Sequence, residues 1–248
     1  MKADLHVHTT KSFDGVLDRR AVAAAAKARG IAAVAVCDHD KSPAASDFPA
    51  EAVDDVLLIP GIEYSTECGH LLGLFLTRPV AEPQAGSRMP FAAAAAEIHA
   101  AGGLAILAHP FEQAADFSAR TREIEALLPH IDGVEVFNSR ADYKHGGANA
   151  AAAAFAAAHG IACVTAGSDA HGKAEVGNAY VELACPCEPD AVRAALTAGA
   201  VPAGARSPRR YIALSQLTKA KRQKLGARRT LKSAALLCYL TIKDIFQR

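Results

Sequence analysis

The stretch Ala3-Asp4-Leu5-His6-Val7-His8-Thr9 alternates polar and apolar side chains, which is typical of a β-strand near the start of the chain. Residues two apart in a strand share a face, so we expect Asp4, His6 and His8 to project together. Neighbouring imidazoles are common ligands of transition metals. One His-x-His pair is weak evidence, because 10 histidines in 248 residues give about 0.4 such pairs by chance. The return of ligand-type residues along the chain therefore decides the interpretation.

Five more apolar, strand-like runs end beside polar side chains that can bind a metal. In a β/α barrel the C-terminal ends of successive strands face one common mouth, where the functional residues of that fold gather. Random placement would scatter these residues, so the pattern predicts a barrel with a metal site at its mouth. The runs and the residues that follow them are 32–36 with His39, 56–59 with Glu63, 104–108 with His109, 134–137 with Asn138, and 161–165 with Asp169 and His171.

Segments rich in helix formers lie between the strand-like runs, and several of them end at a glycine. Strands that alternate with helices of this length indicate parallel βαβ units, so the predicted fold class is α/β. Two segments contain alanine tracts, which we interpret as closely packing helix faces. The predicted helices are residues 17–29, 91–101, 118–128, 148–159 and 189–198.

Five short motifs occur in an order that resembles the PHP (polymerase and histidinol phosphatase) superfamily of phosphoesterases. They are DLHVHT at residues 4–9, CDHD at 37–40, GIE at 61–63, AHP at 108–110 and GSDAH at 167–171. The resemblance spans about residues 1–205 and is specific, because several independent motifs share one order. It implies a distorted (β/α)7 TIM-like barrel whose mouth holds two or three divalent metal ions, commonly Mn, Zn or Fe.

The resemblance also implies which side chains hold these metals, with Glu63 bridging the first two. Asp14 stands where many family members have histidine, although Asp followed by Gly also occurs in the family. The spacing between Glu63 and His70 varies among subfamilies, and Cys37 replaces a more usual threonine. The implied ligands are His6, His8, Glu63 and Asp169 for the first metal, Glu63, His70 and His109 for the second, and Asp14, His39 and His171 for the third.

These ligand types determine the chemistry that we expect. Imidazoles and carboxylates suit Zn, Mn or Fe(II), and a bridging carboxylate holds two ions about 3.5 to 4 Å apart, where both contact one phosphoryl group. A water between the ions loses a proton at neutral pH and becomes the nucleophile. The sequence has no Gly-x-Ser-x-Gly or Walker motif. The leading hypothesis is a metal-dependent phosphoric ester hydrolase that cleaves a phosphomonoester of a small metabolite or nucleotide through a metal-bridging hydroxide.

Two other functions stay open. The same metals can run nuclease or phosphodiesterase chemistry on nucleic acid or a nucleotide, because monoester and diester cleavage differ only in the leaving group and in the room at the mouth. The second alternative is a non-catalytic metal-binding regulatory module, as some polymerase-associated domains of this family are. Such a module is expected to lack ligands, whereas this chain retains nearly all of them.

Cations near strand ends are candidates for binding a substrate phosphate. Lys41, Arg140 and Lys173 each follow a strand-like run within a few residues of an implied ligand. Arg140 is the leading candidate, because a guanidinium binds phosphate through two parallel hydrogen bonds. Asp4 and Asp38 are expected behind the ligands, with Asp4 orienting a ligand histidine. The histidines expected to be ordinary helix or loop residues are His99, His130, His145 and His159.

The composition indicates one large domain followed by a different C-terminal segment. With 51% hydrophobic residues, the 248-residue chain can bury one core, and we predict a catalytic barrel over residues 1–205. Ligands begin near the first residue, so we expect no cleavable signal, and the apolar stretch 234–240 is too short to span a bilayer. The six cysteines lack zinc-finger spacing, and some lie in apolar runs. A reducing, cytoplasmic location fits these features.

The net charge of the chain also changes sign after residue 205. Residues 206–248 contain 12 Lys and Arg against the single acid Asp244, whereas residues 1–205 contain 15 Lys and Arg and 25 Asp and Glu. This basic, helical extension is predicted to contact nucleic acid or an anionic membrane, or to fold back on the acidic body. Its segment 231–246 is apolar enough to pack on the barrel or a second subunit, and the sequence does not specify the oligomeric state.

Overall fold

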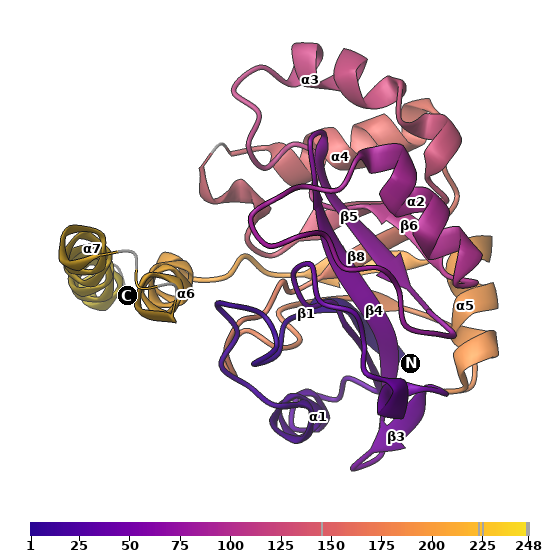
Figure 1. The fold of residues 1–248 in the computed structure, drawn as a ribbon, viewed down its shortest axis with the longest axis horizontal. Coiled ribbons are helices and arrows are strands. Elements are labelled where there is room, and N and C mark those ends of the chain that lie inside the picture. The colour runs from indigo at the N-terminus through magenta and orange to yellow at the C-terminus, as the bar shows by residue number, and fades with distance from the viewer. Residues whose placement is uncertain (145, 223, 225, 247–248) are drawn as a thin grey trace.

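The computed structural model describes residues 1–144, 146–222, 224 and 226–246, and a curled sheet with helices outside it forms its centre (Figure 1). Two strands that lie far apart along this sheet, residues 2–7 and 164–167, also meet. The Asp169 N–H donates to the His6 carbonyl at 2.8 Å, and the His8 N–H donates to the Ala170 carbonyl at 2.9 Å. The sheet therefore closes almost completely into a barrel. In order around it lie β1 (Lys2–Val7), β2 (Ala33–Val36), β4 (Val56–Thr66), β5 (Gly69–Leu74), β6 (Leu104–Leu107), β7 (Gly133–Asn138) and β8 (Val164–Gly167).

Additional strands and one reversed strand distort this barrel. β9 (Ala179–Glu182) and β10 (Val201–Gly204) extend the sheet beside β1 by antiparallel pairing, and β3 (Glu51–Val53) pairs with β4. β5 runs antiparallel to both of its neighbours, whereas the other neighbouring pairs from β1 to β8 are parallel. The prediction of a distorted TIM-like α/β barrel is confirmed.

The sequence analysis did not predict β5. This strand follows β4 after only Glu67 and Cys68, and so short a connection cannot hold a crossover helix, which forces antiparallel pairing. The Thr66 hydroxyl stabilises the turn by donating to the Gly69 carbonyl at 2.6 Å. Because the strand is reversed, its first residues lie at the end of the barrel where the parallel strands finish.

The five helices predicted around the barrel are present, with bounds that differ by a few residues. Two of them begin at aspartate caps, since the Asp18 side chain accepts from the Ala21 N–H and the Asp116 side chain from the Ser118 and Ala119 N–H groups. The helices are α1 (Arg19–Lys27), α2 (Phe91–Ala100), α3 (Phe117–Glu125), α4 (Ala148–Ala158) and α5 (Pro189–Ala198), with short 3-10 helices η1 (Ala45–Asp47), η2 (Leu128–His130) and η3 (Ala141–Tyr143).

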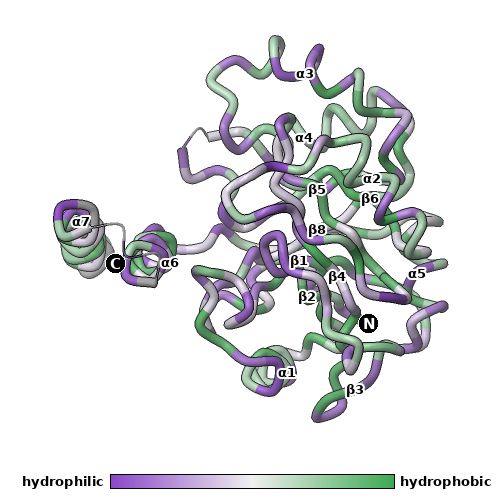
Figure 2. The backbone as a smooth tube through the Cα atoms, in the orientation of Figure 1, coloured by the Kyte–Doolittle hydropathy of each residue, from purple (hydrophilic) through white to green (hydrophobic). Residues whose placement is uncertain are grey.

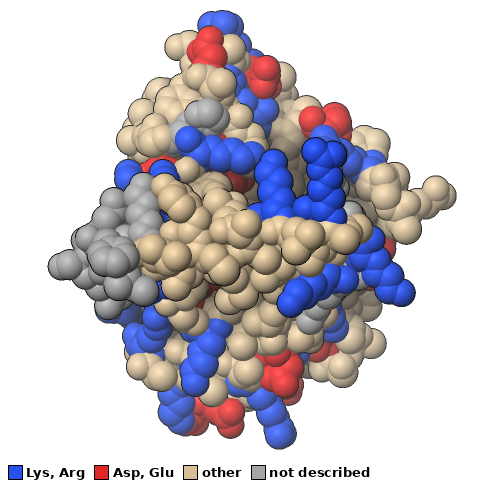
Figure 3. Space-filling model, turned by 90° about the vertical axis from the view of Figure 1, so that its left-hand side faces the viewer, with Lys and Arg blue, Asp and Glu red and all other residues tan. Residues whose placement is uncertain are grey.

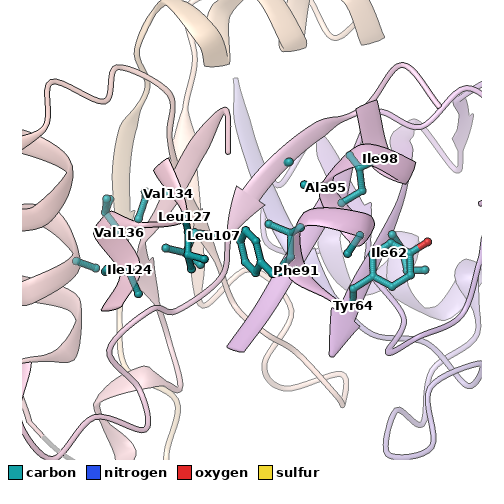
Figure 4. Close-up of a cluster of buried hydrophobic side chains, with 14 of the residues drawn as sticks. Ile62, Tyr64, Phe91, Ala95, Ile98, Leu107, Ile124, Leu127, Val134 and Val136 are labelled. Carbon is teal, nitrogen blue, oxygen red and sulfur yellow. The ribbon is translucent and has the colours of Figure 1, made fainter. Parts of the chain in front are cut away.

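Alanine-rich helix faces pack closely on the barrel, as predicted. In α2, Ala94 and Ala95 are buried together with the larger Phe91 and Ile98, which fill the space around the small side chains (Figure 4). Figure 2 shows hydrophobic segments concentrated along the strands at the centre of the molecule. Burying a large apolar side chain contributes about 1.5 to 3 kcal/mol, so this layer holds the strand ends in fixed positions.

The chain after β10 forms a pair of helices on one side of the barrel (Figure 1). α6 (Arg209–Arg222) is tied to the barrel, since the Arg140 side chain donates to the Ser215 hydroxyl at 2.8 Å. α7 (Ala227–Phe246) packs on α6 and lies farther from the barrel (Figure 1). None of the described helices combines the length and the apolar composition needed to cross a membrane. The helical extension is present, and the domain division at residue 205 stays a prediction.

Candidate metal centre

All nine side chains predicted to bind metal come together at one end of the barrel. β1 and β4 carry His6 and Glu63 there, and the loops that follow the parallel strands carry most of the others. His70 reaches the same end because it is the second residue of the reversed strand β5, opposite Ser65 of β4. The cluster comprises His6, His8, Asp14, His39, Glu63, His70, His109, Asp169 and His171.

The buried carboxylate of Glu63 lies at the centre of the cluster. Its Oε1 is 2.7 Å from His70 Nδ1 and 3.1 Å from His109 Nε2. Its Oε2 is 3.3 Å from Nε2 of both His6 and His8. The two oxygens therefore face different imidazole groups, which is the arrangement required of a carboxylate that bridges two ions.

Two further carboxylates, Asp169 and Asp14, lie among the imidazoles of the cluster. Asp169 Oδ1 is 3.3 Å from His8 Nε2 and 3.4 Å from His171 Nδ1. Asp14 lies between two imidazoles, with Oδ1 3.3 Å from His171 Nε2 and Oδ2 4.0 Å from His39 Nε2. This geometry brings together Asp14, His39 and His171, the set that the family resemblance implies for a third metal.

The described residues contain four groups of three side chains whose ligand atoms lie within 4.8 Å of one another. The groups overlap, so the cluster is one continuous donor surface. His39, implied for the third metal, also lies 2.9 Å from Glu63 through its Nδ1. The groups are His6, His8 and Asp169; His8, His39 and His171; His39, Glu63 and His70; and His6, His109 and Glu135.

Mutual electrostatics dominate this buried site. Burial opposes ionisation of Glu63, yet His39, His70 and His6 hold its pKa well below the usual range. Burial likewise opposes protonation of His39 and His109, but facing carboxylates raise the pKa of His39 to about 9 and that of His109 to about 10. The ionised carboxylates therefore hold protons on these imidazoles, and a cation that binds here would replace those protons.

Three buried atoms in the cluster lack a well-directed hydrogen bond among the described residues, although oppositely charged groups lie close to them. They are Asp14 Oδ1, Glu63 Oε2 and His39 Nδ1, and the last two lie only 2.9 Å apart. A buried polar atom without a partner costs about 1 to 3 kcal/mol, so native proteins rarely leave several together. Coordination of cations would satisfy all three atoms. This mixed nitrogen and oxygen donor set fits divalent Zn, Mn or Fe.

Asp4 lies behind the cluster, and its predicted orientation of a ligand histidine stays a prediction. Its carboxylate accepts from the Ser168 N–H at 2.9 Å, the Ser168 hydroxyl at 2.6 Å and the Gly177 N–H at 2.7 Å. Burial raises the pKa of Asp4 to about 6, although these bonds oppose the rise. Asp4 therefore holds the turn that precedes Asp169, and it touches only the backbone N–H of His6, not its imidazole.

Asp38 lies behind the cluster and holds the loop after β1. It accepts from the Thr9 N–H at 2.7 Å, the Thr9 hydroxyl at 2.6 Å and the Ser12 N–H at 3.1 Å. Ser12, which the sequence analysis did not single out, contacts His8 Nδ1 through its hydroxyl at 3.1 Å and accepts from the His39 N–H at 2.9 Å. These contacts leave the Nε2 side of His8 facing the carboxylates.

Glu135 was missed by the sequence analysis. Its Oε1 lies 3.0 Å from His6 Nδ1, and its Oε2 accepts from the His109 N–H at 2.9 Å and the Asn138 amide at 3.1 Å. A single carboxylate therefore orients two members of the cluster. The available signal was an acidic residue inside the apolar run 134–137, which a barrel interior tolerates only when the charge has partners.

The structure shows why the GSDAH motif begins with a glycine, Gly167. A Cβ at this position would lie 2.2 Å from the His6 Cβ and 2.8 Å from Glu135 Oε1. No side chain fits there, because β8 passes directly against the backbone and Cβ of His6 in β1. His109 and Asp169 adopt left-handed backbone angles, with φ of 26° and 52°, and such strain is typical of functional sites.

The predicted phosphate-binding cations lie in different surroundings. Arg140 is buried, with Nε 3.0 Å from Glu175, Nη1 2.9 Å from His171 Nδ1 and Nη2 2.8 Å from the Ser215 hydroxyl. All three of its nitrogens are engaged, so a phosphate would have to displace one of these partners. Lys41 pairs with Glu82 at 2.7 Å, and Lys173 is exposed. Their binding of phosphate stays a prediction.

A different cation of the extension lies near the cluster. The Phe13 ring stacks on the His39 imidazole with centroids 5.0 Å apart, and Lys219 Nζ of α6 lies 4.3 Å from the Phe13 ring centroid. The sequence analysis placed Lys219 in a separate basic segment. Its position became visible only in the structure, because the contact joins residues far apart in the chain.

Three of the remaining histidines, His99, His130 and His159, lie outside the cluster. His99 Nε2 lies 2.8 Å from Asp132, and His159 Nδ1 lies 2.9 Å from the Phe155 carbonyl, both outside the cluster. His130 ends η2 and is half-buried. His145, expected to be an ordinary loop residue, lies outside the described residues.

The fold and the cluster define a class, an α/β barrel with a metal-binding donor set at its mouth. A family model described as PHP-associated matches residues 146–201. An uncharacterized protein of Methanocaldococcus jannaschii is 31% identical to this chain over 193 residues, which covers 74% of this chain and 70% of the relative. The chain belongs to the PHP superfamily, as its motifs predicted.

Solved structures share the fold at lower sequence identity. An amidohydrolase from Chromobacterium violaceum, with bound sulfate and no metal, is 20% identical with a TM-score of 0.56 over 68% of this chain and 87% of its own. A two-domain protein from Bacteroides vulgatus that contains a predicted PHP-like metal-dependent phosphoesterase is 18% identical, with a TM-score of 0.56 over 83% of this chain and 65% of its own. The fold is thus that of PHP-like phosphoesterases and of an amidohydrolase.

Proposed function

We propose that this protein is a metal-dependent phosphoesterase that hydrolyses a phosphomonoester of a small metabolite or nucleotide. The observation that carries the proposal is Glu63, whose two oxygens face separate imidazole groups in a buried site that also contains Asp14 and Asp169. Two or three divalent ions bound there would neutralise phosphoryl oxygens and lower the pKa of the attacking water. Mn, Zn and Fe(II) suit these donors.

The chain itself orients the donors. Glu135 and Ser12 contact the Nδ1 atoms of His6 and His8, so the Nε2 atoms face Glu63 and the mouth. Outer contacts of this kind fix the ring orientation and the tautomer of a ligand histidine. The centre is therefore organised before substrate arrives, which avoids reorganisation during the reaction.

Substrate phosphate would meet cations at the rim of the mouth. Lys219 is the best placed of the described lysines, because its ammonium lies over Phe13, which stacks on His39. Arg140 supports His171 from behind. Buried thiols such as Cys37 and Cys163 support our proposal of a reducing, cytoplasmic location.

The test compares Glu63→Gln with a matched control, Glu123→Gln. The first substitution removes the charge at the centre of the cluster, and the second changes a carboxylate on α3 that is 65% exposed and pairs with Arg120. With Mn(II) or Zn(II), Glu63→Gln should lower hydrolysis of a phosphomonoester about a hundredfold or more, in line with the loss of one preorganised electrostatic contact. Glu123→Gln should leave the rate unchanged.

The same assay separates the alternatives. Equal rates for both variants would show that Glu63 is not at the reacting centre. Faster hydrolysis of bis(p-nitrophenyl) phosphate or a short oligonucleotide than of p-nitrophenyl phosphate would replace the monoesterase with a phosphodiesterase or nuclease. Stoichiometric metal binding without hydrolysis of any of these esters would favour a non-catalytic metal-binding module.

A further inference from the structure

α7 is apolar on two opposite sides. Leu240 is buried on the side that packs against α6. On the opposite side Leu231, Tyr239 and Ile242 are 69%, 61% and 55% exposed. A helix with apolar side chains all round is normally covered on every side, so the outer side of α7 lacks its expected cover in the isolated chain.

The exposed residues form one continuous stripe. Positions three, four and seven apart share a face of a helix, and five exposed apolar residues of α7 follow that spacing. Leu236, which is 37% exposed, lies on the side of Leu240. A stripe about three turns long is unlike the scattered exposed hydrophobic residues of an ordinary surface, and it marks an interaction site. We call this surface the α7 stripe; it comprises Leu231, Ala235, Cys238, Tyr239 and Ile242, all of them exposed.

Basic side chains surround the α7 stripe. Arg228 and Lys232 are exposed beside Leu231, and Lys221 and Lys224 are exposed at the connection between α6 and α7. Figure 3, which views this side of the molecule, shows an uncharged band bordered above and below by Lys and Arg. The segment 206–248 contains 12 basic residues and only one acidic residue. The partner must therefore offer both negative charge and an apolar phase.

These two requirements favour one occupant. A second copy of the stripe would bring two strongly positive surfaces together without compensating acids. A nucleic acid would neutralise the cations but would leave Leu231 and Ile242 in water. An anionic bilayer satisfies both, since its headgroups attract Lys and Arg while its acyl boundary accepts the apolar side chains.

We propose that α7 binds in the interface of an anionic lipid membrane, with the α7 stripe facing the acyl chains and the neighbouring cations at the headgroups. The helix lies along the surface, in agreement with the absence of a spanning helix among the described residues. Tyr239 suits this depth because its ring is apolar and its hydroxyl is polar. The proposal does not depend on the phosphoesterase function.

The experiment measures cosedimentation of the full chain with vesicles of phosphatidylcholine, with and without phosphatidylserine. One variant combines Leu231→Glu, Tyr239→Glu and Ile242→Glu. The matched control is Val201→Glu, which changes a 63% exposed hydrophobic residue of β10. We expect binding to need phosphatidylserine and to weaken about tenfold or more in the stripe variant, because apolar burial and charge attraction both contribute. Val201→Glu should bind as the unmodified protein does.

A second variant, Arg228→Glu with Lys232→Glu, tests the charges. It should also weaken binding to phosphatidylserine vesicles, and more strongly at low salt, because salt screens the attraction. Circular dichroism establishes that the variants keep their helices. Equal vesicle binding by the stripe variant and the unmodified protein would overturn the proposal. A dimer that the stripe variant converts to a monomer, or oligonucleotide binding that it abolishes, without any vesicle binding, would overturn it in favour of those partners.

Discussion

The barrel mouth and the α6–α7 extension differ in which side chains they bury and which they expose. At the mouth, carboxylates and imidazoles are buried and face one another at 2.7 to 4.0 Å. In the extension, cations are exposed and a line of apolar residues lies in water. The donor atoms of the mouth suit cations, whereas the apolar stripe of the extension suits an apolar surface. The two regions therefore differ in the chemistry of the partner that each can bind.

The difference shows how function can be separated along one chain. Buried charges tolerate little change, because each one is held by several neighbours and an unpaired charge in the interior is costly. Exposed charges and apolar residues on α7 have few intramolecular partners, so changing them costs little stability. Substitutions should accordingly affect hydrolysis and surface binding independently, except where α6 meets the mouth.

Metal removal should produce the largest effect and should act on the mouth alone. Elemental analysis of the untagged protein is expected to find two or three transition metal ions per chain, because the nine clustered donors suffice for that number. Chelation should reduce phosphomonoester hydrolysis to the buffer rate, and Mn(II) or Zn(II) should restore it. Vesicle binding serves as the control and should not change. Fewer than one ion per chain after reconstitution would contradict the site.

Glu135→Gln should have the next largest effect. The amide keeps the size of the side chain but removes the charge that faces His6 Nδ1 at 3.0 Å. Loss of such an outer contact lowers metal affinity or activity about 10- to 100-fold. Metal titration and initial rates measure both quantities. Glu97→Gln is the control, because Glu97 binds the Ala81 N–H and Arg78 outside the barrel. Equal behaviour of the two variants would mean that Glu135 only fills space.

The sequence predicted the mouth well because motifs at strand ends need only the barrel topology to converge. Nothing local predicted Glu135 as a partner of His6, since the two residues are 129 positions apart. β5 was missed because a two-residue turn leaves no helical signal. Phosphate binding by Arg140 stays a prediction, and no local pattern indicated that tertiary packing would give its nitrogens Glu175, His171 and Ser215 as partners. Contacts across the chain, and not local patterns, decide these roles.

Lys219 tests the place where the two regions meet. The sequence analysis treats the basic extension as separate from the chemistry, whereas the structure places this ammonium over Phe13 beside His39. Lys219→Gln should lower kcat/KM for a phosphomonoester about tenfold, because one charge-assisted contact to phosphate contributes about 1.5 kcal/mol. Lys221→Gln, at an exposed position two residues away, is the control and should change kcat/KM less than about twofold. The reverse order would show that Lys219 does not face the substrate.

Ser215→Ala should have the smallest effect on hydrolysis and should test the boundary between the two regions. The substitution removes the hydroxyl that accepts from Arg140 at 2.8 Å, while the contacts of Arg140 with Glu175 and His171 remain. The free energy of unfolding in urea should fall by about 1 to 3 kcal/mol, because a charged, buried donor loses one partner. Thr218→Ala is the control, since the Thr218 hydroxyl donates to the Leu214 carbonyl of its own helix. Hydrolysis should change little, because the ligands of the mouth keep their contacts. A collapse of hydrolysis without a matching loss of stability would instead mean that α6 positions His171 through Arg140, which would make the extension part of the catalytic unit.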